Sequence, residues 1–388
     1  MPRLAARAGG RCRTGLRGAL LLESGLAVEG CGFGAEGVRV GEVVFSTSMT
    51  GYPESLTDPS YRGQILVYTH PMVGNYGVPR PRVRHGVLYG LESERVHVEG
   101  FVVAELSRHA PRPGRLGLHE WLRAQGVPGV FRVDTRMLVR HLRSRGTMMG
   151  AVGVYPEGEP APWDELEAAL EAAPGYGVVD YTKQVTPAGP VAHEPPGAWA
   201  RVSMLDCGVK HGILRRLTSL GLAVTRYPCS TPPEELVDGY QGVVVSNGPG
   251  NPALLAREAE TVAALVEYGV PLLGVCLGMH LVALGLGAET YKLPYGHRGP
   301  NKPVVEAGGG RCYITTQNHG YAVRRESLEG TGLRVWFYNP DDGSLEGLLH
   351  ESKPVLATQF HPEAGPGPYD TFWVFEAFAR MVRRHAQG

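Results

Sequence analysis

One cysteine stands where an apolar segment is expected to turn sharply into a helix. Residues 274–278 read Gly-Val-Cys-Leu-Gly, so the apolar run ends, Cys276 follows at once, and a helical pattern begins. A strand-to-helix turn of this kind lifts a nucleophilic side chain clear of its sheet. A helix N-terminus and a neighbouring imidazole both favour the thiolate, the reactive form of cysteine. The pattern predicts a nucleophilic thiol, although a buried structural cysteine also fits it.

A histidine and a glutamate follow a second predicted strand. The sequence His361-Pro362-Glu363 comes directly after the strand-like residues 354–360. Ligands bind at the carboxyl ends of the strands in such folds, and residues two apart in extended geometry point the same way. Glu363 could therefore orient the His361 imidazole beside Cys276. We predict a Cys-His-Glu triad; an unrelated surface histidine is the alternative for this segment taken alone.

A glycine-rich turn follows a third predicted strand. Residues 246–252 read Ser-Asn-Gly-Pro-Gly-Asn-Pro, after the strand 242–246. The backbone amides of Gly248 and Gly250 could hold an oxyanion, whereas the simpler alternative is an ordinary Gly-Pro turn. Three such features at three strand ends of one sheet favour a catalytic site.

The elements that would position these residues alternate between strand and helix. Such alternation predicts an α/β fold in which a doubly wound, mostly parallel sheet is covered by helices on both faces. The predicted strands are 202–206, 222–227, 242–246, 271–275, 312–316, 333–338, 345–349 and 354–360. The predicted helices are 210–220, 253–268, 277–286 and 369–385.

A separate α/β domain is expected before this sheet. It contains predicted strands at residues 19–23 and 38–45 and a helix that begins at Asp134 as N-cap. Residues 32–37 spell GxGxxG, but a strand follows instead of a helix, so we interpret them as a turn and not as a dinucleotide site. We expect this domain to cover residues 19–155, with a linker rich in proline, glycine and alanine over 156–200 and the second domain over 201–388.

Composition limits the classes of function. The 388 residues hold 38 basic and 38 acidic side chains, a balance that argues against a nucleic-acid binder. The six cysteines are scattered without a CxxC pair, and no histidine has metal-ligand spacing. We therefore predict no disulfide framework, no metal site, and the reduced thiols of a cytoplasmic protein.

Two segments need a separate interpretation. Residues 268–288 carry no Asp, Glu, Lys or Arg, but Pro271 and His280 interrupt them, so we predict a buried strand and helix and no membrane span. The first 22 residues hold five arginines and no acid or serine. We interpret residues 1–18 as a disordered extension in preference to a transit peptide, which is usually rich in serine.

Residues 201–388 resemble the class I (triad-type) glutamine amidotransferase domain, whose sheet is flavodoxin-like. The whole chain resembles the family of carbamoyl phosphate synthetase small subunits. The stretches that carry the resemblance are residues 41–52 (GEVVFSTSMTGY), 56–61 (LTDPSY), 134–136 (DTR), 296–304 (GHRGPNKPV) and 317–321 (QNHGY).

The resemblance implies a role for each site residue. Cys276 would form a glutamyl thioester, His361 would exchange the protons, and Glu363 would orient His361. The amides of Gly248 and Leu277 would stabilise the oxyanion. The positions that match glutamine-holding residues of the family are Ser60, Gly250, Asn318, Gly320 and Tyr321. Ser60 lies in the first domain, so the resemblance implies a site closed where the domains meet.

The chain departs from the family at one position. The family usually reads Gly-x-Cys-x-Gly-His-Gln, and the glutamine contacts the substrate, whereas this chain has His280 in that place. Imidazole can still donate or accept a hydrogen bond, but its shape and charge differ. We expect an active site in which glutamine binds more weakly or in a pH-dependent way.

The resemblance also implies a partner. No phosphate-binding GxxxxGK[ST] loop occurs, and the chain is too short for two large nucleotide domains. We expect it to supply only ammonia from L-glutamine, without a cofactor of its own, to a large carbamoyl phosphate synthetase subunit that uses ATP, Mg²⁺ and bicarbonate in arginine and pyrimidine synthesis. The alternatives are a silent scaffold or regulatory subunit of that complex, which His280 would explain, and a stand-alone cysteine hydrolase.

Overall fold

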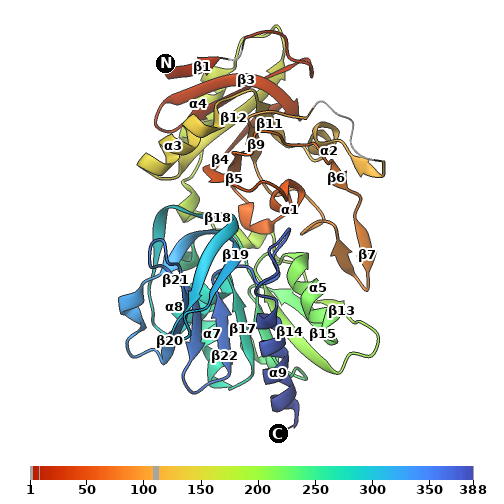
Figure 1. Ribbon diagram of the computed structural model, residues 1–388, viewed down its shortest axis with the longest axis vertical. Helices are drawn as coiled ribbons and strands as arrows, with labels where there is room; N and C mark the ends of the chain where they lie inside the picture. Colours follow the sequence, from red (N-terminus) through yellow and green to blue (C-terminus); the bar gives the residue numbers. More distant parts are fainter. Residues whose placement is uncertain (1–2, 8, 108–112, 388) are drawn as a thin grey trace. The chain divides into compact units, whose positions relative to one another are not determined.

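The computed structural model describes residues 3–7, 9–107 and 113–387. Their contacts divide the chain into two compact units (Figure 1). Unit 1 comprises Met1–Pro81 and Glu94–Val179, and unit 2 comprises Arg82–Ser93 and Asp180–Gly388. The short segment Arg82–Ser93 therefore leaves the predicted first domain and belongs to unit 2.

The described part of unit 1 is built on an eight-stranded sheet of mixed direction. Its strand order is β1-β3-β11-β9-β5-β4-β12-β2, and β2 also pairs with β3, so the sheet closes on itself. The strands are β1 (Arg3–Arg7), β2 (Leu16–Leu22), β3 (Leu26–Gly34), β4 (Gly37–Ser46), β5 (Gln64–Tyr68), β9 (Gly100–Val103), β11 (Pro128–Phe131) and β12 (Met148–Pro156). The pair β6 (Val78–Pro79) and β10 (Arg115–Leu116) forms a separate small sheet.

Helices pack on this sheet through their apolar faces. Leu138 and Leu142 of α3 join one buried cluster of the sheet, and Leu166 of α4 joins another. The predicted N-cap is confirmed, because the Asp134 carboxylate accepts a hydrogen bond from the Met137 amide at 2.9 Å. The helices are α1 (Tyr52–Leu56), α2 (Leu118–Ala124), α3 (Thr135–Arg145) and α4 (Trp163–Ala172), with short 3₁₀ turns η1 (Pro59–Tyr61) and η2 (Tyr176–Val178).

The N-terminal extension is ordered where it is described, so the prediction of a disordered segment over 1–18 is wrong there. Residues Arg3–Arg7 form β1, which pairs in parallel with β3. Arg17 lies 4.0 Å from Glu29 and 3.9 Å from Glu157, and so finds acidic partners. The first 22 residues contain no acidic side chain, so the acidic partners of their arginines cannot be found within that segment of the sequence.

Unit 2 is built on a ten-stranded sheet among the described residues. Its strand order is β13-β15-β14-β16-β17-β22-β21-β20-β18-β19. The strands are β13 (Val191–His193), β14 (Ala200–Asp206), β15 (Leu222–Pro228), β16 (Val243–Val245), β17 (Leu272–Val275), β18 (Thr290–Glu306), β19 (Cys312–Val323), β20 (Leu333–Tyr338), β21 (Leu345–His350) and β22 (Val355–Thr358). A hairpin of β7 (Arg82–Arg84) and β8 (Val87–Tyr89) belongs to the same unit.

The sheet of unit 2 is parallel in only one half, which corrects the prediction of a mostly parallel sheet. From β15 through β14, β16 and β17 to β22 every pairing is parallel. From β22 outward through β21, β20, β18 and β19 every pairing is antiparallel. The antiparallel strands follow one another without an intervening α-helix, and a parallel connection would need such a crossover.

Helices cover both faces of the parallel half, as predicted. Val243 and Val245 point to the face covered by α6 (Pro233–Val237), α7 (Ala256–Glu267) and α8 (Leu277–Gly285). Val244 points to the opposite face, which α5 (His211–Ser219) and α9 (Trp373–Gln387) cover (Figure 1). Alternate residues of a strand face opposite sides, and both sides here are buried cores. The short turns η3 (Thr182–Gln184), η4 (Pro252–Leu254) and η5 (Arg325–Leu328) complete the unit.

Strand β18 was not predicted from the sequence. Pro294, Pro300 and Pro303 interrupt it, and proline argues against a strand. The pairing of β18 with β19 shifts register between Lys292 and His297 and again between Gly299 and Lys302. Pro294 and Pro300 lie within these irregular intervals, where no regular ladder hydrogen bond is lost.

The segment 156–200 is shared between the two units. Helix α4 packs against β12 and β4 in unit 1, whereas β13 extends the sheet of unit 2. The uncharged residues 268–288 form β17 and α8, as predicted. Across the described chain, no helix combines the length and the apolar composition that crossing a membrane requires.

Two disulfides contradict the prediction of reduced thiols. Cys12 is bonded to Cys31 in unit 1, and Cys207 to Cys229 in unit 2. Cys276 and Cys312 are free. Scattered cysteines in a long chain gave no spacing signal because each pair meets only through the sheet pairings. Intracellular disulfides are rare, but they are common in hyperthermophiles.

The cysteine pairing is testable by counting thiols. Purified without reductant and then denatured, the chain should react with a chromogenic disulfide reagent at two of its six cysteines, and at all six after reduction. The variant Cys312→Ser should lower the first count to one. Six reactive thiols before reduction would contradict the pairing.

Candidate active site

Cys276 occupies a strained turn between β17 and α8. Its backbone angles are φ 54° and ψ −102°, in a region that residues other than glycine rarely adopt. The turn is held on one side because the Cys276 amide donates to the Thr358 carbonyl of β22 at 2.7 Å. Such strain at a reactive side chain is typical of a nucleophile elbow.

The two glycines beside Cys276 are required by close packing. A side chain at Gly274 would lie 2.8 Å from the backbone of Gly278, and one at Gly278 would overlap the Val245 carbonyl oxygen. The sharp turn therefore fits between β16, β17 and the first turn of α8 only without Cβ atoms at these positions.

His361 and Glu363 lie at the end of the neighbouring strand β22, and their side chains are hydrogen-bonded. His361 Nδ1 is 2.6 Å from Glu363 Oε1, and both residues are buried. The His361 amide donates to the Thr316 carbonyl of β19 at 2.9 Å, which fixes the backbone. The structure thus brings together the carboxylate and imidazole that the sequence placed two residues apart.

The thiol of Cys276 interacts with the His361 ring, and this contact raises the pKa of the imidazole further. His361 Nε2 nevertheless has no hydrogen-bond partner of good geometry among the described residues. We conclude that the thiol and the ring are neighbours whose alignment falls short of an ideal hydrogen bond. Catalytic hydrogen bonds are often long or poorly aligned in a site without substrate.

Lys210 is a member of the site that the sequence analysis missed. Its Nζ lies 2.9 Å from Glu363 Oε1 and donates to the Ala364 carbonyl at 2.7 Å. The side chain is buried where the chain leaves β14 and enters α5. A single lysine in a loop carries no motif, so only the meeting of the strand ends reveals it.

The buried charges shift the pKa values of both Glu363 and His361. Burial alone would raise the pKa of Glu363, but Lys210 and His361 lower it to about 2. Burial alone would lower the pKa of His361, but the Glu363 carboxylate raises it to about 10. His361 is therefore protonated and Glu363 ionised at neutral pH. An imidazolium beside a thiol favours the thiolate, which is the nucleophilic form.

These pKa shifts set the pH range over which the pair stabilises the fold. For Glu363, the contribution is complete above the ordinary value of 4.5 and is lost as pH falls through about 2. For His361, it is complete below the ordinary value of 6.5 and is lost as pH rises through about 10. Both contributions to stability are therefore complete between pH 4.5 and pH 6.5.

The predicted oxyanion amides lie at the same edge of the sheet. Leu277 is the first residue of α8, where backbone amides have no partner within the helix. Gly248 follows β16, and a side chain there would overlap the Cys207 carbonyl oxygen and lie 2.7 Å from Leu277 Cδ2. Gly250 has φ 96°, which favours glycine. The two loops meet close to the nucleophile.

Strand β19 carries Asn318, Gly320 and Tyr321 past the nucleophile. Cys276 Sγ is 3.8 Å from the Asn318 carbonyl oxygen. A second contact not foreseen is Gln359, whose Nε2 donates to Cys276 Sγ at 3.6 Å. Ser60, the remaining predicted residue, lies buried in unit 1, where its amide donates to Asp58 Oδ1 at 2.9 Å.

His280 is a buried residue of α8. Burial lowers its pKa to about 4, even though contacts with the Tyr321 backbone and the Gln359 side chain act in the opposite direction. The ring is therefore neutral at physiological pH. Any pH dependence that its own titration introduces would appear near pH 4 and not near neutrality.

A second group of chemically active side chains lies elsewhere in unit 2. His297, His319 and Glu346 place one potential metal-ligating atom each within 4.8 Å of one another. The histidines are far apart in sequence, so the spacing of residues gave no metal signal.

Two family models match the chain. Residues 203–381 match the model "Glutamine amidotransferase class-I", and residues 20–152 match "Carbamoyl-phosphate synthase small chain, CPSase domain". The boundaries of the first match enclose Cys276, His361 and Glu363.

Curated relatives are similar over almost the whole chain. The carbamoyl phosphate synthase small chain of Sulfurisphaera tokodaii is 48% identical over 97% of this chain and 99% of its own length. The small chain of Saccharolobus solfataricus is 48% identical over 94% of this chain and 98% of its own length. The carbamoyl phosphate synthase arginine-specific small chain of Chaetomium globosum is 40% identical over 96% of this chain and 80% of its own length.

Removing the Lys210 charge tests the buried ion pair. Lys210→Met leaves Glu363 with a single cationic neighbour, so its pKa should rise and acid unfolding should begin at a higher pH. Breaking a buried pair costs about 3–5 kcal/mol of unfolding free energy, measurable in denaturant. The exposed Lys183, paired with Asp180 at 3.3 Å, offers a matched control, and Lys183→Met should cost less than about 1 kcal/mol. Equal losses in the two variants would contradict the assignment.

Proposed function

The chain belongs to the family of carbamoyl-phosphate synthase small chains, which carry a class I glutamine amidotransferase domain, and from this membership we propose that it hydrolyses L-glutamine through Cys276. It is the glutamine-hydrolysing component of a carbamoyl-phosphate synthase, and it passes the ammonia to a large synthetase subunit. The observation that carries the proposal is the strained Cys276 beside a buried Lys210–Glu363–His361 charge chain.

The first half of the reaction forms a thioester. The Cys276 thiolate attacks the side-chain amide carbon of glutamine, and the new C–S bond pushes negative charge onto the amide oxygen. The amides of Gly248 and Leu277 stabilise this oxyanion. When the intermediate collapses, the C–N bond breaks and the protonated His361 gives its proton to the departing NH2 group, which leaves as ammonia. Its pKa of about 10 keeps that proton available at neutral pH.

The second half releases glutamate. Neutral His361, having given up its proton, accepts one from a water molecule, whose oxygen attacks the thioester carbon. The C–S bond breaks, and the thiolate and the imidazolium are restored together with glutamate. Glu363 stays ionised throughout because Lys210 holds its pKa near 2. Glu363 thereby stabilises the charged ring in each half-reaction.

Ammonia must reach the partner in its neutral form. Ammonium, the form that dominates in water at neutral pH, has no lone pair and cannot act as a nucleophile. A sheltered path into the large subunit is therefore part of the proposal. That subunit would use ATP, Mg²⁺ and bicarbonate to make carbamoyl phosphate, and the glutaminase chain would need no cofactor.

A weakened or silent glutaminase is the second candidate, and His280 is the observation that favours it. The neutral, buried ring lies against the Tyr321 backbone and Gln359, which itself contacts Cys276. Its Nε2 has no hydrogen-bond partner among the described residues, so the ring need not hold the substrate as the family's glutamine does. The hydrogen bond between His361 and Glu363 and the strained turn at Cys276 support an active enzyme, which we favour.

The division of labour is tested by replacing the nucleophile. Cys276→Ser in the complex with the large subunit should lower glutamine-dependent carbamoyl phosphate synthesis by more than about a thousandfold. Synthesis from added ammonium should remain, because the partner performs it. Cys312→Ser, which changes the exposed free thiol, should leave both activities unchanged. Loss of both activities in Cys276→Ser would refute the proposed roles.

The role of His280 is tested by His280→Gln. A carboxamide can offer a donor and an acceptor together, and one additional hydrogen bond contributes about 1 kcal/mol. The KM for glutamine should fall by about fivefold with little change in kcat. A KM unchanged by the substitution would show that position 280 does not contribute to substrate binding in this chain.

A further inference from the structure

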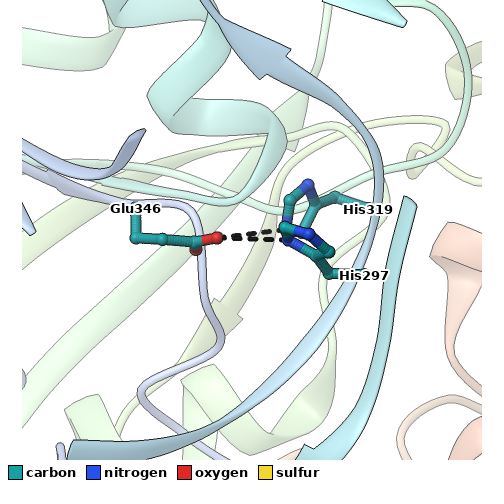
Figure 2. A group of neighbouring side chains, drawn as sticks. All are labelled: His297, His319 and Glu346. Atoms are coloured by element: carbon teal, nitrogen blue, oxygen red, sulfur yellow. Dashed lines mark hydrogen bonds and ion pairs between the residues drawn. The ribbon is translucent and has the colours of Figure 1, made fainter. Parts of the chain in front are cut away.

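His297, His319 and Glu346 form a buried cluster on three strands of the antiparallel half of the unit 2 sheet. His297 on β18 and His319 on β19 are direct partners across the two strands, and Glu346 comes from β21. Figure 2 shows both rings beside the Glu346 carboxylate. All three residues are buried, and Glu346 is completely inaccessible to solvent.

The hydrogen bonds of His319 leave a lone pair facing oxygen atoms. Its Nδ1 is 2.8 Å from the Tyr321 carbonyl, which can only accept, so Nδ1 carries the proton. In the neutral ring, the other nitrogen, Nε2, then presents a lone pair. This nitrogen is 3.2 Å from Gln317 Oε1 and 3.8 Å from Glu346 Oε1. The amide group of Gln317 is engaged elsewhere, since its Nε2 donates to Thr315 Oγ1.

His297 shows the same arrangement. Its Nε2 is 2.9 Å from Asp342 Oδ2, and its Nδ1 is 3.3 Å from Glu346 Oε1. When Nε2 donates its proton to Asp342, Nδ1 presents a lone pair to the Glu346 carboxylate. The other carboxylate oxygen, Glu346 Oε2, is buried and has no hydrogen-bond partner among the described residues. Ser344 Oγ is one donor near these acceptors, 3.5 Å from Glu346 Oε1. A cation among the remaining acceptors, either a metal ion or a proton, would balance the buried carboxylate.

The outer contacts are those of metal-ligating histidines. Such histidines usually donate their second ring N–H to a carboxylate or a backbone carbonyl, which fixes the tautomer. Asp342 serves His297 in this way, and the Tyr321 carbonyl serves His319. Two imidazoles and one carboxylate are a common ligand set for zinc.

The spacing of the ligand atoms suits a small divalent ion. Tetrahedral zinc with ligands at about 2.0–2.1 Å separates those ligands by about 3.3 Å. The separations here are 3.3 Å between His297 Nδ1 and Glu346 Oε1 and 3.8 Å between His319 Nε2 and Glu346 Oε1. Small side-chain movements would close the set around one ion.

We propose that His297, His319 and Glu346 bind one divalent cation of the zinc type, with Gln317 Oε1 or a water molecule as fourth ligand. The ion connects β18, β19 and β21. Because His319 lies between Asn318 and Gly320, it also fixes the stretch of β19 that passes beside Cys276. The role is structural and positioning, since none of the three ligands contacts the nucleophile.

A proton is the competing occupant of the cluster. Burial alone would lower the pKa of His297, but its hydrogen bonds to Asp342 and Glu346 raise it to about 9. A doubly protonated His297 could therefore bridge the two carboxylates without a metal. Metal binding must displace this proton. A metal titration therefore distinguishes a cluster that binds a metal ion from one that holds only the proton.

The test is a metal titration of the full chain with both free thiols replaced (Cys276→Ser and Cys312→Ser), which removes the other soft ligands. With Zn²⁺, we expect one ion per chain after loosely bound metal is removed, and a higher melting temperature than in the chelated protein. With Co²⁺, we expect the visible absorption of a tetrahedral nitrogen and oxygen site without thiolate charge-transfer bands. Substoichiometric binding, or no change in melting temperature, would overturn the proposal in favour of the bridging proton.

Two variants and one control assign the site. Glu346→Gln should abolish stoichiometric binding, and the exposed Glu351→Gln should leave it unchanged. Because Glu346 is buried and its variant could unfold, Asp342→Asn provides an independent reading: that side chain is 40% exposed and contacts only His297 of the ligands. Loss of such an outer partner should weaken metal affinity ten- to hundredfold. Affinity unaffected by Asp342→Asn, or binding retained in a folded Glu346→Gln protein, would place the metal elsewhere and refute the assignment.

Discussion

The buried contact between Glu363 and His361, completed by Lys210, is the constraint on which the site depends. Three ionisable groups without access to water cost several kcal/mol each in desolvation, and only close, well-oriented partners offset that cost. Here the partners come from the ends of β14 and β22, which are not neighbours in the sheet. The parallel half of the sheet must therefore be correctly assembled before the charges can be buried.

The nucleophile depends on the same assembly through a different mechanism. Cys276 is held at φ 54° because its amide bonds to β22 and because two glycines leave no Cβ atoms in the turn. The strain is balanced by burial of β17 side chains in the cores on both faces of the sheet and by burial of α8 in one of these cores. Strand β22 thus contributes to both halves of the chemistry, since it anchors the elbow and ends in the imidazole.

The antiparallel half of the sheet contributes to the site through strand β19. Its outer strands β18 and β19 extend beyond the parallel core, and β19 returns to place Asn318 beside the thiol. Strand β18 contains three prolines, and its pairing with β19 is irregular in two places. The buried polar cluster between β18, β19 and β21 ties them together, and its satisfied outer hydrogen bonds fix the position of each ring.

Elements with a local signal can be recognised from the sequence alone. The alternating apolar pattern indicated the parallel strands and their helices, the Asp134 cap indicated the start of α3, and two strand ends indicated Cys276, His361 and Glu363 as candidates. These features depend on residues close together in the chain, where periodicity and turn chemistry act. Other features became visible only in the folded chain: Lys210, Gln359, the two disulfides, the pairing of the arginine-rich start and the His297–His319–Glu346 cluster. Each of these arises when segments distant in sequence meet. Pairing of the strands and burial of the core supply the free energy that brings such segments together, and neither can be read from one segment of the sequence.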